Sequence, residues 1–273
     1  MIVSVQGAEL FYSTRGHGPA CLVLSGIGTR PYERQTPPQL SDRLKLVYVD
    51  LRGSGQSTGE PTDLTFDLLA QDLEAIRVDL GLERIAVLGH SILGILAIEY
   101  GRHCPASVAH VITAGTPPIG DLAQVGAQAA AFFAADASEE RKQLLRDNLA
   151  QLPAGASMMQ TLFAQTPMRF CDPRFAAAPL FTEVVSRPAL LQHVMGTLAP
   201  AWDVTVGASS LRVPIFLAHG RYDYVVPYLL WQGVAAKLPN ATLQIFERSG
   251  HQPFLEEPDR FVEALTDWMA REG

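Results

Sequence analysis

Short runs of consecutive apolar residues recur along the chain, and Lys45–Val49 and Ile85–Leu88 are two of them. Such runs are typical of strands buried on both faces, as in a parallel sheet covered by helices. Between them, apolar side chains after Thr65 are spaced three and four residues apart, which predicts a helix that Thr65 caps and that ends near Gly81. The alternation predicts a doubly wound α/β fold. The eight strand-like runs are Met1–Val5, Leu10–Thr14, Cys21–Leu24, Lys45–Val49, Ile85–Leu88, Val108–Thr113, Ile215–Ala218 and Leu243–Phe246.

Three further helices are expected between or after these strands. One begins at Ser91, and another follows Pro227, a good first-turn residue, and ends near Leu238. The last helix follows Pro258 and carries a stripe of large apolar residues that should face the core. That stripe consists of Phe261, Leu265 and Trp268.

One long segment interrupts the alternation of strands and helices. Residues 116–212 contain no convincing strand and are rich in Ala, Leu, Phe and Met, with several prolines. This composition predicts several short helices, inserted into a core made of residues 1–115 and 213–273. An insertion at this point would lie over the carboxyl ends of the strands, where α/β folds bind ligands. We therefore expect a helical cap, or lid, with Trp202 as a candidate for the wall of an apolar substrate pocket.

The stretch VLGHSILG places a serine directly after a buried strand and before a predicted helix. A strand–turn–helix with serine at the turn is a nucleophile elbow, whose usual pattern is G-x-S-x-G. Gly89 fits this pattern, but Leu93 occupies the second glycine position and Gly94 follows one residue later. We expect Ser91 to be the nucleophile and Gly94 to relieve crowding at the turn. His90 is expected to be structural, with its side chain pointing away from the site.

Two later loops carry residues that could activate this serine. A serine hydroxyl attacks well only when a base removes its proton and an acid orients that base. Asp223 follows the strand-like run at 215–218, and His251 follows the run at 243–246. Both lie at strand ends, so the fold can bring them to Ser91. Asp203 is the alternative acid.

An oxyanion formed during such a reaction needs two backbone N–H donors. One is expected from Ile92, at the start of the helix, where the helix dipole favours negative charge. The other is expected from Ile27, in the glycine-containing loop after Cys21–Leu24. The loop DLRGSGQS lacks the G-K-[ST] ending of a phosphate loop and is expected to be a tight turn that supports the elbow.

Five motifs together resemble the α/β-hydrolase superfamily, and within it the proline iminopeptidase-like group. The resemblance implies a cofactor-free hydrolase with a mostly parallel eight-stranded sheet, flanking helices and a helical cap. It also implies Ser91 as nucleophile, Asp223 as acid and His251 as base. Ser25 replaces the histidine usual in the oxyanion loop, and His90 and Ile92 replace the glycine and tryptophan usual around the nucleophile of true iminopeptidases. The motifs are SGIG, DLRGSGQS, GHSILG, HGRYDYVVP and SGHQPFLEEPDRF.

Composition limits the partners and the location of the protein. The net charge is −7 without a Lys/Arg cluster, which disfavours nucleic acid as a partner. The histidines show no metal-ligand spacing, and no apolar run reaches membrane-spanning length. The three cysteines lack a C-x-x-C motif, which predicts free thiols, and the start of the chain does not resemble a signal peptide. We expect a cytoplasmic protein that acts on a small molecule without a metal or cofactor, and leave its oligomeric state open.

The predicted activity is hydrolysis of an ester, lactone or amide of a small, fairly apolar substrate through an acyl-serine intermediate. Three alternatives remain open at this point. They are an aminopeptidase of the proline iminopeptidase type, an acyltransferase or C–C bond hydrolase using the same three residues, and a ligand receptor with little turnover.

Overall fold

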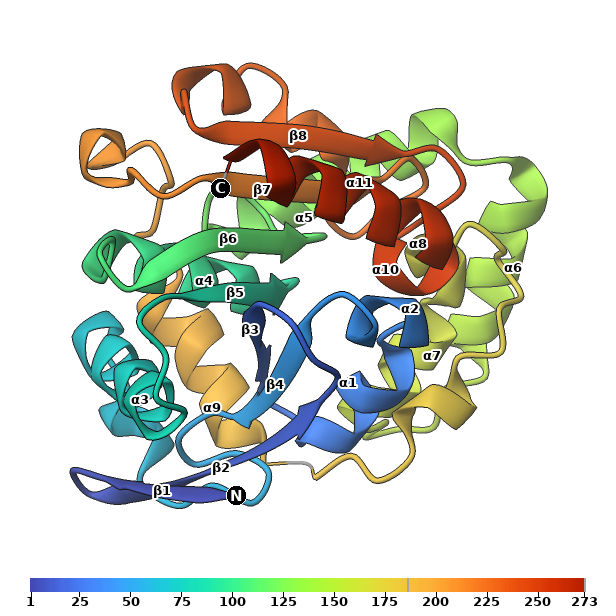
Figure 1. The fold of residues 1–273 in the computed structure, drawn as a ribbon. Coiled ribbons are helices and arrows are strands. Elements are labelled where there is room, and N and C mark those ends of the chain that lie inside the picture. The colour runs from blue at the N-terminus through green and yellow to red at the C-terminus, as the bar shows by residue number, and fades with distance from the viewer. Residues whose placement is uncertain (186, 273) are drawn as a thin grey trace.

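One eight-stranded sheet organises the computed structural model, which describes residues 1–185 and 187–272. The strand order is β1-β2-β4-β3-β5-β6-β7-β8 (Figure 1). Strands β1 and β2 pair antiparallel, as do β2 and β4, and every later neighbouring pair is parallel. The expected mostly parallel sheet is therefore confirmed. The strands are β1 (Ile2–Val5), β2 (Ala8–Arg15), β3 (Ala20–Ser25), β4 (Lys45–Asp50), β5 (Ile85–His90), β6 (Val108–Ala114), β7 (Ile215–Gly220) and β8 (Ala241–Phe246).

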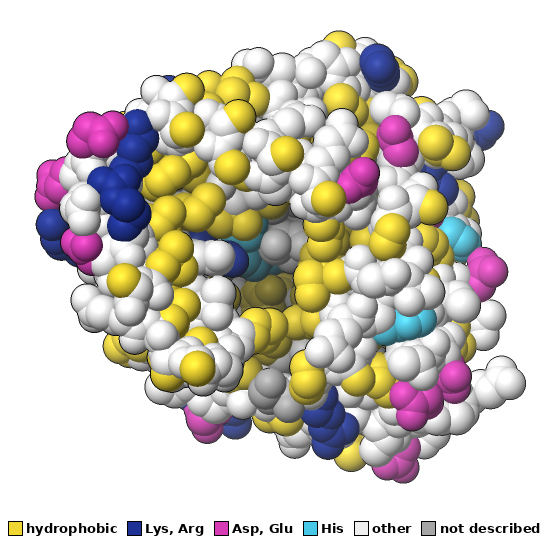
Figure 2. All heavy atoms as spheres, turned by 180° about the vertical axis from the view of Figure 1, so that it is seen from behind, with side chains coloured by type: hydrophobic (Ala, Val, Ile, Leu, Met, Phe, Trp, Pro, Cys, Tyr) yellow, Lys and Arg dark blue, Asp and Glu magenta, His cyan; other side chains and the backbone are white. Residues whose placement is uncertain are grey.

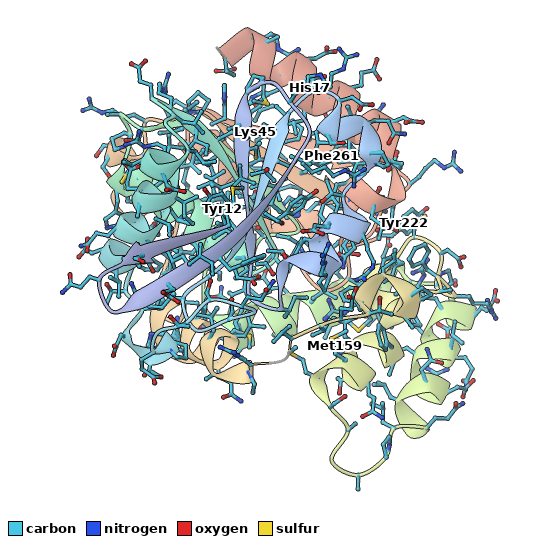
Figure 3. All side chains as sticks on the ribbon, turned by 60° about the horizontal axis from the view of Figure 1, so that its bottom comes forward. Tyr12, His17, Lys45, Met159, Tyr222 and Phe261 are labelled. Atoms are coloured by element: carbon cyan, nitrogen blue, oxygen red, sulfur yellow. The ribbon has the colours of Figure 1, made fainter. Side chains whose placement is uncertain are left out.

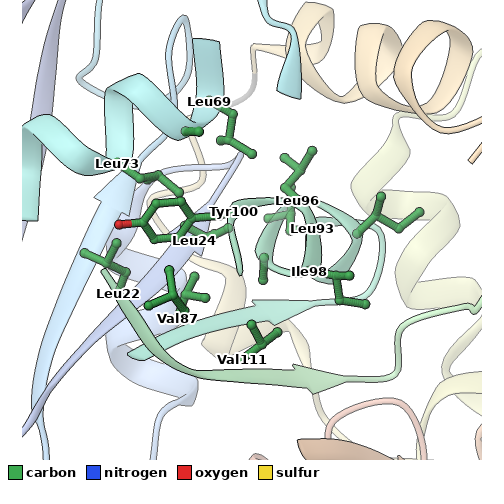
Figure 4. Close-up of a cluster of buried hydrophobic side chains, with 14 of the residues drawn as sticks. Leu22, Leu24, Leu69, Leu73, Val87, Leu93, Leu96, Ile98, Tyr100 and Val111 are labelled. Carbon is green, nitrogen blue, oxygen red and sulfur yellow. The ribbon is translucent and has the colours of Figure 1, made fainter. Parts of the chain in front are cut away.

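Alternate side chains of the central strands enter two separate hydrophobic clusters, one on each face of the sheet. On β3, Leu22 and Leu24 belong to the larger cluster, whereas Cys21 and Val23 belong to the smaller one. The larger cluster includes side chains of helices α3 (Phe66–Asp79) and α4 (Leu93–His103), as Figure 4 shows. The smaller cluster includes side chains of α10 (Pro253–Glu256) and α11 (Pro258–Glu272). Burial on both faces explains why the central strands read as continuous apolar runs.

Local sequence signals explain several helix boundaries. The Thr65 side chain accepts a hydrogen bond from the Leu68 backbone N–H at 3.1 Å and caps α3, as expected. Gly81 follows that helix with a φ of 66°, a conformation that favours glycine. The apolar stripe of α11 is buried, as expected. The short helices of the core are α1 (Thr29–Gln35), α2 (Pro38–Ser41) and η1 (Pro61–Asp63).

The helix expected after Pro227 is not formed, so this prediction is wrong. The segment contains two short 3₁₀ turns, η5 (Tyr228–Trp231) and η6 (Ala235–Lys237). Gly233, between them, has a φ of 78°, which a continuous right-handed helix does not allow.

Between β6 and β7, the described residues form helices and turns, with one isolated bridge between Ile119 and Asp203. Figure 3 shows a lobe of these helices, with Met159 in it, beyond the sheet end opposite to Lys45, where β4 begins. Among the described helices, none is both long and apolar enough to cross a membrane. The elements are α5 (Leu122–Asp136), α6 (Glu139–Ala150), α7 (Met158–Ala164), α8 (Thr166–Arg169), η2 (Ala178–Phe181), α9 (Pro188–His193), η3 (Val194–Leu198) and η4 (Ala208–Ser210).

Candidate active site

Ser91 occupies a sharp turn between β5 and α4. Its φ is 55°, in the left-handed region that a non-glycine residue adopts at a cost of about 1–3 kcal/mol. Two hydrogen bonds hold the turn: the Ser91 backbone N–H donates to Ala114 O at 2.8 Å, and the Thr116 hydroxyl donates to Ser91 O at 2.9 Å. The geometry is that of a nucleophile elbow.

The unusual glycine spacing fits this turn. A Cβ on Gly89 would lie 2.6 Å from the Gly94 Cα, so the strand and the helix touch at these two glycines. A Cβ on Gly94 would overlap the Thr116 hydroxyl, so this glycine leaves room for the hydrogen bond to Ser91 O. Leu93 is only 4% exposed and packs in the larger hydrophobic cluster. Gly94 therefore relieves the crowding, as expected from the sequence, and Leu93 is accommodated as a core residue.

Asp223 and His251 lie together, although they come from different loops. His251 Nδ1 lies 2.7 Å from Asp223 Oδ2, and both side chains are almost completely buried. The other carboxylate oxygen of Asp223 accepts hydrogen bonds from the backbone N–H groups of Val225 at 2.9 Å and Val226 at 2.8 Å. These contacts fix the carboxylate, which in turn orients the imidazole ring.

Backbone contacts hold His251 from the other side. Its backbone N–H donates to Arg169 O at 2.6 Å. Gly115 has a φ of 58°, and a Cβ at this position would lie 2.7 Å from His251 Nδ1. Nε2 of His251 is buried and has no hydrogen-bond partner among the described residues. An imidazole that donates from Nδ1 presents a lone pair at Nε2, which can accept a proton.

Ser91 and His251 line one cavity of about 430 Å³ together with Ile27 and Ile92. In Figure 2, a hollow with a mostly hydrophobic rim contains His and Lys or Arg side chains. Most of the lining is apolar and comes from both the core and the segment between β6 and β7. The other lining residues are Gly26, Tyr32, Gln35, His90, Leu93, Ala156, Met158, Met159, Thr161, Leu162, Gln165, Arg169, Phe170, Phe181, Leu191, Met195 and Gln252.

The two expected oxyanion donors stand at this cavity. Ile92 precedes α4, where the first N–H groups of a helix have no partner within the helix. The Ile27 N–H makes a long hydrogen bond of 3.3 Å to Ser25 Oγ, which in turn donates to Gly28 O at 2.7 Å. Leu51 N–H donates to Ser25 O at 3.0 Å, so the DLRGSGQS turn is joined to the loop of Ile27.

Two expectations about side chains require correction. Trp202 is not among the cavity residues, because its indole N–H donates to Glu99 Oε1 at 2.8 Å within the core. His90 does not point away from the site. Its ring centroid lies 4.8 Å from that of His251, and it forms part of the cavity wall. Burial and the neighbouring His251 lower the pKa of His90 well below its ordinary value, so His90 is neutral at pH 7.

The remaining candidates lie apart from this cavity. Asp203, the alternative acid, accepts hydrogen bonds from the backbone N–H and the hydroxyl of Thr205 and is occupied locally. Among the described residues, no group of three or more His, Cys, Asp or Glu side chains is placed to hold a metal ion. Sequence reasoning missed Arg169, Thr116 and Gly115, which no motif singles out and which contact the site only through the tertiary fold.

Known proteins are similar to this chain in sequence and in fold. Residues 19–258 match the family described as alpha/beta hydrolase fold. The AB hydrolase superfamily protein YclE of Bacillus subtilis is 30% identical over 96% of both chains. A pimeloyl-[acyl-carrier protein] methyl ester esterase of Chromobacterium violaceum is 28% identical over 96% of this chain and 98% of its own. The crystal structure of a Mycobacterium smegmatis proline iminopeptidase superposes with a TM-score of 0.77 at 20% identity, covering 100% of this chain and 98% of its own. The family match over residues 19–258 and the 30% identical relative show that the chain belongs to the α/β-hydrolase family.

Proposed function

We propose that the chain is a serine hydrolase that cleaves an ester, lactone or amide of a small, fairly apolar substrate. One observation carries the proposal. At a single cavity, Ser91 occupies a strained turn, and His251 contacts the buried Asp223 through Nδ1 while its Nε2 has no partner among the described residues. This is the set of groups that a hydroxyl nucleophile needs.

In the proposed reaction, the Ser91 hydroxyl attacks the carbonyl carbon while His251 Nε2 accepts its proton. The tetrahedral oxyanion receives hydrogen bonds from the backbone N–H groups of Ile27 and Ile92. His251 then protonates the leaving alcohol or amine, and an acyl-serine remains. Water, deprotonated by His251, attacks the acyl-serine; the bond to Ser91 Oγ breaks, the acid is released, and His251 returns the proton to Ser91 Oγ. Asp223 keeps the proton on Nδ1 and stabilises the imidazolium.

We propose that residues 116–212 act as a helical cap on a core formed by residues 1–115 and 213–273. Side chains from this segment, such as Met159, Leu162 and Phe170, complete the apolar wall of the cavity. An apolar wall excludes water and strengthens the electrostatic interactions within the site. The relative named as a methyl ester esterase supports an ester substrate. An aminopeptidase would hold a free amine with carboxylates, and the described cavity residues include no Asp or Glu.

Labelling with a fluorophosphonate, mapped by mass spectrometry, tests this proposal. The protein should be labelled once, at Ser91, and Ser91→Ala and His251→Ala should abolish or strongly slow the reaction. Ser4→Ala and His17→Ala are matched controls, since both side chains are exposed and outside the cavity. Absence of labelling in a folded sample that binds a ligand without turnover would favour a receptor instead. A panel of esters, lactones, thioesters and aminoacyl amides, with product analysis, would then separate the remaining reaction types.

A further inference from the structure

Arg169, at the end of α8, places a guanidinium group in the wall of the cavity that holds Ser91 and His251. Arginine carries five N–H donors. The only side-chain hydrogen bond that Arg169 makes with the described residues runs from Nη2 to Gln165 Oε1, at 3.3 Å. Its Nε is fully buried and has no hydrogen-bond partner in the part of the chain that the structure describes. A buried charged donor without a partner is costly, so it indicates a group that a ligand completes.

None of the described residues that line the cavity carries a carboxylate that could pair with Arg169. Arg169 forms no salt bridge with the described residues, and the lining includes no Asp or Glu. Burial lowers the pKa of Arg169, and the charge of Asp223 opposes this shift without cancelling it. The protein as a whole carries a net charge of −7, so the positive charge here is a local feature rather than the general character of the surface.

The cavity offers further hydrogen-bonding capacity. Gln252 Nε2 donates to Gln35 Oε1 at 2.8 Å, which leaves the Gln35 amide nitrogen and the Gln252 carbonyl oxygen without partners. Exchanging the nitrogen and oxygen of both amides would still leave one donor and one acceptor unused. The rest of the wall is mainly apolar, so polar recognition is confined to a few groups.

We propose that Arg169 binds a carboxylate of the substrate, so that the preferred substrates are esters carrying a free carboxylate joined by a short apolar chain to the bond that is cleaved. This inference rests on the proposed function and narrows its substrate class. A planar guanidinium matches a carboxylate with two parallel hydrogen bonds, which an apolar cavity strengthens. The carboxylate lies either on the acyl side or on the alcohol side of the ester.

Two pairs of substrates test both positions. On the acyl side, monomethyl glutarate is compared with methyl 5-methylhexanoate, in which an isopropyl group replaces the carboxylate at similar volume. On the alcohol side, 4-acetoxybutyrate is compared with 4-methylpentyl acetate. The enzymes are the wild type, Arg169→Met, which keeps the apolar stem, and Arg169→Lys, which keeps the charge. Arg174→Gln is the control, because Arg174 is an exposed residue of the same segment that pairs with Glu140 outside the cavity.

In at least one pair, the wild type should prefer the anionic ester. Arg169→Met should lower kcat/KM for that ester by about 10- to 100-fold, mainly through KM, and should change the neutral ester little. Arg169→Lys should retain part of the preference, and Arg174→Gln should retain all of it. Equal losses for the anionic and neutral esters would overturn the inference, because Arg169 would then serve only to balance Asp223. Absence of any preference in the wild type would overturn it as well.

A binding measurement separates this inference from the proposed function. Calorimetric titration with glutarate needs no turnover and applies equally to the wild type and Ser91→Ala. Binding that disappears in Arg169→Met supports the carboxylate site even if no ester is hydrolysed. If Ser91 is labelled and neutral esters are hydrolysed but glutarate does not bind, the carboxylate site is refuted and the hydrolase remains.

Discussion

Restoring the glycine of the usual elbow pattern, by Leu93→Gly, should destabilise the protein rather than improve it. Leu93 is 4% exposed and packs in the larger hydrophobic cluster, with one side on the cavity. Truncation of a buried leucine to alanine costs about 2–5 kcal/mol, and a position beside an existing cavity belongs at the lower end. Glycine adds about 1 kcal/mol of backbone freedom. We therefore expect a loss of about 3–4 kcal/mol for Leu93→Gly and about 2–3 kcal/mol for Leu93→Ala.

Urea unfolding followed by circular dichroism measures these losses, and the rate of fluorophosphonate labelling reports on the turn. Leu96→Ala is the matched control, because Leu96 is completely buried in the same helix and does not line the cavity. It should lose about 4 kcal/mol while its labelling rate stays close to that of the wild type. A Leu93→Gly protein as stable as the wild type and labelled faster would refute the reasoning. Leu93 would then be a source of strain at the elbow.

Three other changes probe the support of the site. Gly115→Ala should leave the protein folded but reduce ester turnover at least about 100-fold, since the new Cβ would displace His251. His219 is fully buried, and burial lowers its pKa to about 4, so the contribution of His219 to stability is complete above about pH 6.5 and falls by about 3 kcal/mol as the pH drops to about 4; His219→Gln should remove this part of the pH dependence in urea unfolding. Asp72→Ala should cost about 3–5 kcal/mol in the same assay, because it leaves the buried Arg52, now paired at 2.5 Å, without a counter-charge.

Each of these changes has a control in the same chain. Gly126→Ala adds a Cβ that contacts nothing within 4 Å and should leave turnover unchanged. His17→Gln changes an exposed histidine and should leave the pH dependence of stability intact. Asp42→Ala removes an exposed carboxylate and should cost less than about 1 kcal/mol. Gly115→Ala with full turnover, an unchanged acid limb in His219→Gln, or an Asp72→Ala as mild as Asp42→Ala would each contradict the corresponding argument.

The core of the fold was predictable because local patterns and burial agree there. The apolar runs at β3 to β8 and the Thr65 cap depend on short-range sequence, and the structure reproduces them within a few residues. The segment after Pro227 does not follow its local pattern. Its composition is typical of a helix, but Gly233 has a positive φ, which interrupts the helix. Short-range patterns do not indicate where such a turn lies, because most residues of the segment are compatible with both a helix and a turn.

The site was predictable only where a motif carries its chemistry. The sequence indicated Ser91, Asp223 and His251 as the chemical groups, and the structure places Asp223 and His251 in contact and Ser91 at the same cavity. The sequence did not indicate that a hydrogen bond to Glu99 holds the Trp202 side chain in the core. It also did not indicate that the ring of His90 packs beside that of His251. These placements depend on which side chains meet across distant segments. For the same reason, no sequence pattern indicated Arg169, and only the structure identifies it as a residue of the cavity wall.

The backbone contact between Arg169 and His251 limits how the cavity can open. His251 N–H donates to Arg169 O, and Cys171 N–H donates to Glu256 Oε2 at 2.7 Å, so residues 169–171 are fastened to the loop that carries the imidazole. A movement of the whole segment between β6 and β7 as one rigid body would break both bonds and release the imidazole from its position. Helices α5 and α6 are held as well, because Asp136 accepts hydrogen bonds from Arg221 Nη2 at 2.9 Å and the Tyr224 hydroxyl at 2.7 Å, and Arg141 donates to Pro167 O and Phe170 O, both at 2.8 Å. An opening of the cavity that keeps the imidazole in position must therefore leave residues 169–171 in place.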